Sequence, residues 1–165
     1  MSSSALSLEA TTIQIAEEIR VRASIEVTFA ALLDQLGPYN ETEVNKPMPM
    51  NLEAWPGGRW YRDLGENNGH YWGTVQAIKK PTLLEICGPL FMSNPVINNL
   101  QYRLTESGGV TVITFRQQSF GLVLDEYRNA KSGWAHLHEG LRQRAEALEG
   151  QWTEISVQHV SQAQQ

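Results

Sequence analysis

Residues 125–149 read DEYRNAKSGWAHLHEGLRQRAEALE, a stretch without proline that decides the fold. A set of its apolar residues repeats every three or four positions, which is the period of one face of an α-helix. These residues are Trp134, Leu137, Leu141, Ala145 and Leu148. We therefore expect a C-terminal helix over 125–149, ended by Gly150, that is long enough to cross a small domain. Its apolar face requires another layer to cover it.

The chain before this helix alternates between apolar and polar residues, which is typical of strands with one buried face. Turn sequences such as Pro56-Gly57-Gly58 and 65–69 divide it into short pieces. The pattern predicts strands over residues 51–55, 59–64, 70–78, 83–87, 100–104 and 110–118. Because short turns join them, we expect these strands to form an antiparallel meander.

The N-terminal part adds one strand and one short helix. Apolar residues alternate with polar ones over 13–22, and only Glu17 interrupts the apolar face. Ser24 is suited to cap a helix that Gly37-Pro38 ends. This order predicts an α+β fold, in which a curved antiparallel sheet wraps around the C-terminal helix. We expect a single domain over 12–150, a flexible N-terminus over 1–11 and a tail over 151–165.

Composition narrows the class of protein. The chain has 165 residues, 41% of them hydrophobic, as expected for one globular domain. The net charge is −5 and there is no basic stripe, which argues against a nucleic-acid partner. No apolar run approaches the roughly 20 residues that span a bilayer, and the start does not resemble a signal peptide, so we expect a cytoplasmic protein without a membrane partner. The chain has a single cysteine, Cys87, so we expect no disulfide within it. Its His, Cys, Asp and Glu residues do not have the spacing of a metal site, so we expect no metal, and we expect no other cofactor.

Four short motifs give the chain a family resemblance. They are Pro56-Gly57-Gly58-Arg59-Trp60, Trp72-Gly73-Thr74-Val75, Gly88-Pro89-Leu90, and Gly133-Trp134 followed by Leu137 and Leu141. Taken in this order, they resemble the START/birch-pollen-allergen superfamily, called SRPBCC, over residues 13–148. The branch that they resemble is that of the activator of heat-shock-chaperone ATPase. The resemblance implies a helix-grip fold. Superfamily members bind lipids, hormones or polyketides, act as cyclases or dehydratases, or activate chaperones.

One departure from the resemblance lowers the expectation of an enzyme. Relatives often carry a histidine near the end of the last strand, where this chain has Gln117. Glutamine does not titrate near neutral pH, so it cannot serve there as an acid or base. A cyclase- or hydrolase-like enzyme would instead have to use His70, Tyr71 or Glu17, and this alternative remains open.

The leading hypothesis is non-enzymatic binding of a small hydrophobic or aromatic ligand. A helix that crosses a curved sheet leaves a cavity where the two diverge, and such cavities bind small molecules. Periodicity directs a set of mainly aromatic side chains toward this space, with Tyr71 inward and Trp72 outward unless a bulge intervenes. The predicted ligand-binding residues are Trp60, Tyr71, Tyr102, Phe115, Gln117, Trp134 and His138. Core filling remains an alternative for the tryptophans.

Two further predictions concern an inward-facing charged pair and an exposed apolar patch. Glu17 and Arg62 both point inward by alternation, so they could form a pair that orients a polar ligand. A chaperone-linked or stress-response interaction protein would instead expose an apolar patch containing Trp55, Trp72 and the 89–95 loop. Trp72, Leu83 and Cys87 are predicted to face outward, where they would expose apolar surface. A homodimer that covers this surface is therefore also a possible arrangement.

Overall fold

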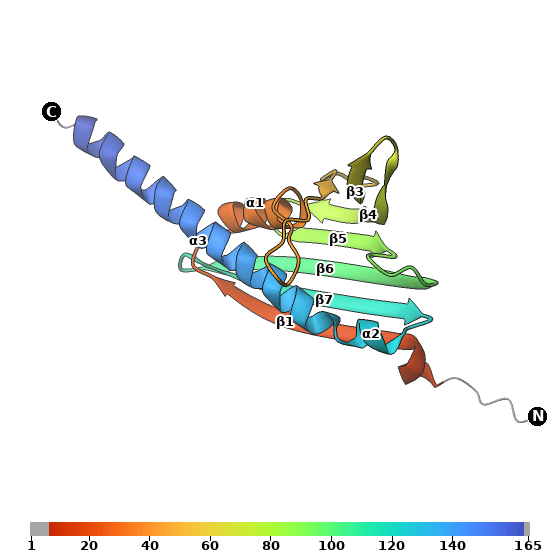
Figure 1. Cartoon of the computed structure of the whole chain (residues 1–165). Helices are drawn as coiled ribbons and strands as arrows, with labels where there is room; N and C mark the ends of the chain where they lie inside the picture. Colours follow the sequence, from red (N-terminus) through yellow and green to blue (C-terminus); the bar gives the residue numbers. More distant parts are fainter. Residues whose placement is uncertain (1–6, 164–165) are drawn as a thin grey trace, which may run out of the picture.

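A computed structural model describes residues 7–163, with the side chains of residue 7 and of residues 9–154, and shows one sheet crossed by a long helix (Figure 1). A 3₁₀ turn, η1, covers Leu8–Thr11, and the helices are α1 (Ile25–Leu36), α2 (Asp125–Arg128) and α3 (Ala130–Ala163). The strands are β1 (Thr12–Val21), β2 (Asn51–Leu52), β3 (Arg59–Gly65), β4 (Asn68–Lys79), β5 (Leu83–Gly88), β6 (Val96–Ser107) and β7 (Val110–Gly121). The predicted α+β helix-grip architecture is confirmed.

The sheet is antiparallel, and its strand order is β1-β7-β6-β5-β4-β3-β2. The six later strands form the predicted meander, and β1 pairs with β7, so the first and last strands lie side by side. Helix α3 crosses the concave face, and α1 lies beside it (Figure 1). The inward residues of β5, β6 and β7, including Ile86, Leu100 and Ile113, are fully buried beneath the helices.

Helix α1 begins and ends where its sequence predicts. The Ser24 side chain caps it by accepting a hydrogen bond from the backbone N–H of Val27, 3.4 Å away. Gly37 follows the last helical residue, and a Cβ atom there would lie only 2.8 Å from the Leu33 carbonyl oxygen. Glycine is therefore required at the position where the chain leaves the helix.

The C-terminal helix differs from its prediction at both ends. A separate turn, α2, precedes α3, and α3 continues through Gly150 to Ala163. A glycine inside a helix costs only about 1 kcal/mol relative to alanine, and residues 151–163 contain no proline, so Gly150 does not end the helix. Residues 151–163 are thus helical, η1 lies within the N-terminus predicted to be flexible, and residues 1–6 and 164–165 lie outside the described residues.

A β-bulge in β4 places its side chains on other faces than the alternation predicts. Trp60 is opposite Gly73 and Tyr61 is opposite Tyr71, so Trp72 is the extra residue of a bulge. The bulge turns Trp72 inward, where it is 9% exposed, and leaves Tyr71 on the outside, 45% exposed. The prediction that Tyr71 points inward and Trp72 outward is therefore wrong. The apolar surface expected for a homodimer is smaller than predicted, since Leu83 and Cys87 are also partly buried.

Strands β6 and β7 are longer than the alternation indicates. Their pairing extends to Ser107 and Val110, so only Gly108 and Gly109 form the turn, both with positive φ angles. Such two-residue turns match the twist of paired strands and favour glycine. Asn98, on this longer β6, is buried and becomes part of the site described below. In the part of the chain from residue 7 to 163, no helix has the length and hydrophobicity that crossing a membrane requires.

Candidate functional site

The space between α3 and the centre of the sheet is filled by aromatic rings. The ring centroid of Phe115 on β7 lies 4.8 Å from that of Tyr102 on β6, and 4.9 Å from that of Trp134 on α3. The His138 ring packs 4.6 Å from Phe115. Tyr102, Phe115 and His138 are therefore buried core residues, and none of them lines the pocket described below.

Glu17 pairs with His138 and not with Arg62. Its Oε2 atom lies 2.7 Å from His138 Nδ1, and Tyr102 OH lies 3.1 Å from His138 Nε2. The predicted Glu17–Arg62 pair is wrong because β1 and β3 are five strand spacings apart in the sheet order, about 24 Å at the usual spacing. Arg62 instead lines an open polar depression on the β3–β4 hairpin, together with His70 and Tyr71.

Burial and hydrogen bonding shift two of these groups. The hydrogen bond from His138 lowers the pKa of Glu17 below its ordinary value of 4.5; partial burial opposes this change, and the charges of His138 and Lys131 support it. Burial raises the pKa of Tyr102 well above its ordinary value of 10.0, and the charge of Glu17 acts in the same direction. The Tyr102 hydroxyl therefore stays protonated at neutral pH.

Gln117 organises a second buried polar cluster. Its Nε2 atom donates to Asn98 Oδ1 and to Ser119 Oγ, each 3.0 Å away. Its Oε1 atom accepts a hydrogen bond from the indole N–H of Trp134 at 2.5 Å. Asn98 Nδ2 in turn donates to the Gly88 carbonyl at 3.2 Å. Since both amide atoms of Gln117 have protein partners, this side chain fixes the Trp134 ring and is not free to bind a ligand, contrary to its prediction as a cavity residue.

Two other predicted residues also lie away from any cavity under α3. Trp60 is fully buried, and its indole N–H donates to the Leu36 carbonyl at the end of α1, 2.7 Å away. Tyr71 lies on the outer face, where its hydroxyl is hydrogen-bonded to Thr74 Oγ1. The candidate acids and bases His70, Tyr71 and Glu17 do not converge, because Glu17 lies on the opposite edge of the sheet.

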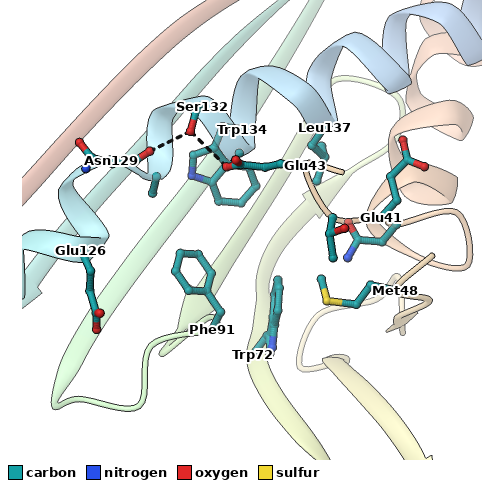
Figure 2. A pocket seen from close by; sticks show the side chains of 14 residues that line it. Glu41, Glu43, Met48, Trp72, Phe91, Glu126, Asn129, Ser132, Trp134 and Leu137 are labelled. Carbon is teal, nitrogen blue, oxygen red and sulfur yellow. Dashed lines mark hydrogen bonds between the residues drawn. The ribbon is translucent and has the colours of Figure 1, made fainter. Parts of the chain in front are cut away.

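A pocket of about 480 Å³ opens at the N-terminal end of α3. Figure 2 shows Trp134 and Leu137 of α3 on one side, with Trp72 of β4, Phe91 of the β5–β6 loop and Met48 of the loop after α1 facing them. These five side chains form its apolar wall. Trp134 is the one predicted ligand-binding residue that lines this pocket, and Trp72 reaches it because of the β4 bulge.

The wall is held in place by hydrogen bonds and ring contacts behind it. The Trp72 indole N–H donates to His70 Nδ1 at 2.9 Å. The Trp72 ring also packs edge-on against the Trp60 and Phe91 rings, with centroids 5.1 and 5.8 Å away. With Trp134 fixed by Gln117, both indoles of the pocket are positioned without a ligand.

The rim of the pocket is polar and mainly acidic. Glu41 and Glu43 come from the loop after α1, and Glu126 comes from α2 (Figure 2). The Ser132 hydroxyl lies 3.1 Å from Glu43 Oε1, and His136 Nε2 lies 3.3 Å from Glu41 Oε1 without the angle of a hydrogen bond. In the region from residue 7 to 154, no cluster of three or more His, Cys, Asp or Glu side chains has the arrangement of a metal site.

Sequence reasoning missed the loop residues of this pocket. Met48, Phe91, Glu41 and Glu43 belong to loops without periodicity, so no pattern predicts where their side chains point. The inward turn of Trp72 had one available signal, which is the adjacent Gly73 inside a strand. Glycine in a strand often marks a bulge or a close backbone approach, and a Cβ atom at Gly73 would lie 2.9 Å from the Cys87 carbonyl oxygen.

Comparisons with known proteins agree with this architecture. A family model described as "Activator of Hsp90 ATPase homolog 1-like protein" matches residues 22–146. Protein MLL2253 from Mesorhizobium loti has a similar structure, with a TM-score of 0.63 and 19% identity, over 81% of this chain and 97% of that one. No curated protein sequence matches the chain.

Two further structures extend the fold assignment. CalU16 from Micromonospora echinospora is 18% identical with a TM-score of 0.58, over 80% of this chain and 75% of that one. Ara h 8.0201 is 14% identical with a TM-score of 0.60, over 82% of this chain and 99% of that one. Identities this low establish the fold alone, which is the helix-grip fold.

Proposed function

Because the chain belongs to the family of Activator of Hsp90 ATPase homolog 1-like proteins, we propose that it binds a small, mainly apolar molecule in the pocket at the N-terminal end of α3. The observation that carries this proposal is the wall of Trp72, Phe91 and Trp134 around an open space of about 480 Å³. Pockets for small organic molecules usually measure about 300–1,000 Å³ and have predominantly apolar walls.

The pocket is formed before any ligand enters it. Trp134 is hydrogen-bonded to Gln117 and Trp72 to His70, so neither indole has to be ordered on binding. A preformed wall reduces the conformational entropy that association costs, which favours binding of even a small molecule. Phe91, 37% exposed, is the most accessible aromatic side chain of the wall and lies where a ligand would enter.

A role in binding is favoured over catalysis. The titratable groups Glu17 and Tyr102 each bond to His138, and none of the three lines the pocket. Gln117, the residue at the position where relatives often have histidine, does not titrate and is fully engaged. The one histidine beside a rim carboxylate, His136, lies 3.3 Å from Glu41 without the angle of a hydrogen bond and is not among the residues that line the pocket, so the pocket lining itself holds no acid–base pair.

Calorimetric titration with 2-(1-naphthyl)ethanol, a neutral aromatic alcohol, tests the proposal. A Cβ atom at Gly133 would lie 3.0 Å from Glu43 Oε1, the end of a flexible side chain in the pocket. Gly133→Leu should therefore fill the pocket while improving helix propensity. Gly150→Leu is the matched control, because a Cβ atom at Gly150 has no atom within 4 Å.

We expect the wild-type protein and Gly150→Leu to bind the probe equally, and Gly133→Leu to bind it at least about tenfold more weakly, a loss of about 1.4 kcal/mol. Absence of binding to the wild-type protein would contradict the proposal. Equal binding by all three proteins would contradict it as well, because the probe would then occupy another site.

Docking to a chaperone is a second candidate function, based on the family description and on exposed apolar side chains. Trp55 is 57% exposed, and Leu64 and Tyr71 are also exposed in the β3–β4 region. Exposed aromatic side chains of this kind are common in protein interfaces. If this candidate is correct, the protein stimulates Hsp90 ATP hydrolysis and Trp55→Ala reduces the stimulation while leaving probe binding intact. No stimulation by the wild-type protein would remove this candidate.

A further inference from the structure

The pocket of the proposed function is negatively charged at its entrance. Glu41, Glu43 and Glu126 line it, and no lysine, arginine or histidine is among its lining residues in the described chain. Glu126 makes no hydrogen bond or ion pair with any residue from 7 to 154 whose side chain the structure describes. A carboxylate beside an apolar wall favours a positively charged partner over a neutral or negative one.

His136 and the N-terminal end of α3, which lie beside Glu41 and Glu43, reduce this negative charge without cancelling it. His136 lies 3.3 Å from Glu41, and it adds at most one positive charge when protonated. The N-terminal end of α3, near Glu43 and Ser132, contributes roughly half a positive charge. Three carboxylates exceed both contributions together, so the rim remains negative.

The wall adds a second attraction for a cation. Trp72 and Phe91 pack with their ring centroids 5.8 Å apart, and Trp134 lies on the other side of the pocket (Figure 2). The faces of aromatic rings attract ammonium groups, most strongly those of tryptophan. Aromatic rings next to carboxylates thus suit a molecule that is apolar over most of its surface and positively charged at one end.

The side chain of Asn40 has an amide nitrogen without a hydrogen-bond partner among the described residues. This residue lines the pocket and is only 3% exposed. Buried amides are nearly always hydrogen-bonded. The missing partner is a hydrogen-bond acceptor, because an amide NH₂ group only donates, so Asn40 marks an unfilled polar position in the pocket and does not itself select a cation.

We propose that the ligand is an apolar organic cation, an amine whose hydrocarbon or aromatic part lies among Trp72, Phe91 and Trp134 and whose ammonium group lies at the carboxylate rim. This inference rests on the proposed function and specifies the chemical class of the ligand. The rim carboxylates select the charge, and the aromatic wall supplies most of the contact area.

Three probes of nearly equal size separate the two proposals. They are 2-(1-naphthyl)ethylamine, 2-(1-naphthyl)ethanol and 1-naphthylacetate, which are positive, neutral and negative at pH 7. Each is titrated calorimetrically into the full-length protein at low ionic strength. We expect the amine to bind about tenfold more tightly than the alcohol, and the carboxylate to bind most weakly.

Variants assign the preference to the rim. Glu43→Gln/Glu126→Gln removes two pocket carboxylates, whereas Glu18→Gln/Glu66→Gln removes two exposed carboxylates outside the pocket lining and changes the net charge equally. We expect the first double variant to lose about tenfold in affinity for the amine and much less in affinity for the alcohol, which carries no charge. The control variant should bind all three probes like the wild-type protein.

The outcomes are distinguishable. If the alcohol or the carboxylate binds as tightly as the amine, the inference is wrong while the proposed function stands. If the amine is preferred but both double variants lose affinity equally, the preference comes from net charge, and the inference is also wrong. If none of the three probes binds, the proposed function fails and the inference fails with it.

Discussion

The Nδ1 atom of His138 lies 2.7 Å from the Oε2 atom of Glu17, and this contact joins the N-terminal third of α3 to the edge strand β1. His138 is 1% exposed, whereas the Glu17 carboxylate is partly accessible. The carboxylate that interrupts the apolar face of β1 therefore has a structural partner. Because the imidazole also reaches Tyr102 at 3.1 Å, one histidine connects the helix to two strands of the sheet.

Replacing Glu17 should give a stability loss that depends on pH. The His138 hydrogen bond lowers the pKa of Glu17 below 4.5, so its carboxylate stabilises the folded state above that pH. Stabilisation is lost as pH falls through the folded-state pKa. Glu17→Gln should lower the free energy of unfolding by about 1 kcal/mol at pH 7. The difference from the wild-type protein should decrease in urea unfolding experiments below pH 4.5.

Glu18→Gln is the matched control for this experiment. Glu18 is the next residue of β1, but it points outward and forms an exposed ion pair with Arg20, 3.1 Å away. Exposed ion pairs contribute about 0–1 kcal/mol, so this variant should differ little from the wild-type protein. A Glu17→Gln effect that is constant with pH, or that increases toward acid, would refute the assigned role of the carboxylate.

Replacing Gln117 should destabilise the protein much more than replacing its neighbour. Gln117→Met removes the partner of the Trp134 indole and leaves Asn98 and Ser119 with fewer hydrogen bonds in the core. Unsatisfied buried groups cost about 1–3 kcal/mol each, so we expect a loss of about 3 kcal/mol in urea unfolding. Gln118→Met, on the exposed face of β7, should change the free energy of unfolding by less than about 0.5 kcal/mol. Similar losses in both variants would show that the buried cluster contributes nothing specific.

The two buried asparagines should respond in opposite directions to the same substitution. Asn98→Leu breaks hydrogen bonds to the Gly88 carbonyl, Gln117 and Ser119, and should destabilise the protein by about 3 kcal/mol. Asn40→Leu removes an amide nitrogen that has no partner among the described residues. It should leave the melting temperature unchanged or raise it, by roughly 4 °C per kcal/mol gained. A melting temperature that falls as far in Asn40→Leu as in Asn98→Leu would show that Asn40 is fully satisfied in the folded protein.

Periodic segments are the part of the fold that the sequence predicts well. The alternation of Leu100, Tyr102 and Leu104 places them on the buried face, and the spacing of Trp134, Leu137 and Leu141 identifies the buried face of α3. These patterns arise because burial of apolar side chains is the dominant stabilising term. Ser24 and Gly37 are predicted for a different reason, since each satisfies a local backbone requirement of a helix end.

The candidate site is less predictable because it depends on non-periodic features. The β4 bulge shifts the strand register by one residue, and this shift alone exchanges the faces on which Tyr71 and Trp72 lie. A side chain that points inward from a strand can either pack in the core or line a cavity, and the alternation pattern does not distinguish the two. Tyr102 and Phe115 point inward as predicted, but their rings pack against His138 and Trp134 of α3, and neither residue lines the pocket. Partners such as Glu17 and His138 depend on strand order, which alternation alone does not give.

Nuclear magnetic resonance of the tryptophan indole N–H groups tests the central claim most directly. The chain has five tryptophans, whose signals can be assigned by single Trp→Phe replacements. On saturation with 2-(1-naphthyl)ethanol, we predict that the indole signals of Trp72 and Trp134 shift, because both rings line the pocket, while those of Trp55 and Trp152 stay in place. Unchanged Trp72 and Trp134 signals at saturating probe, or shifts confined to the exposed Trp55 and Trp152, would contradict ligand binding at the N-terminal end of α3.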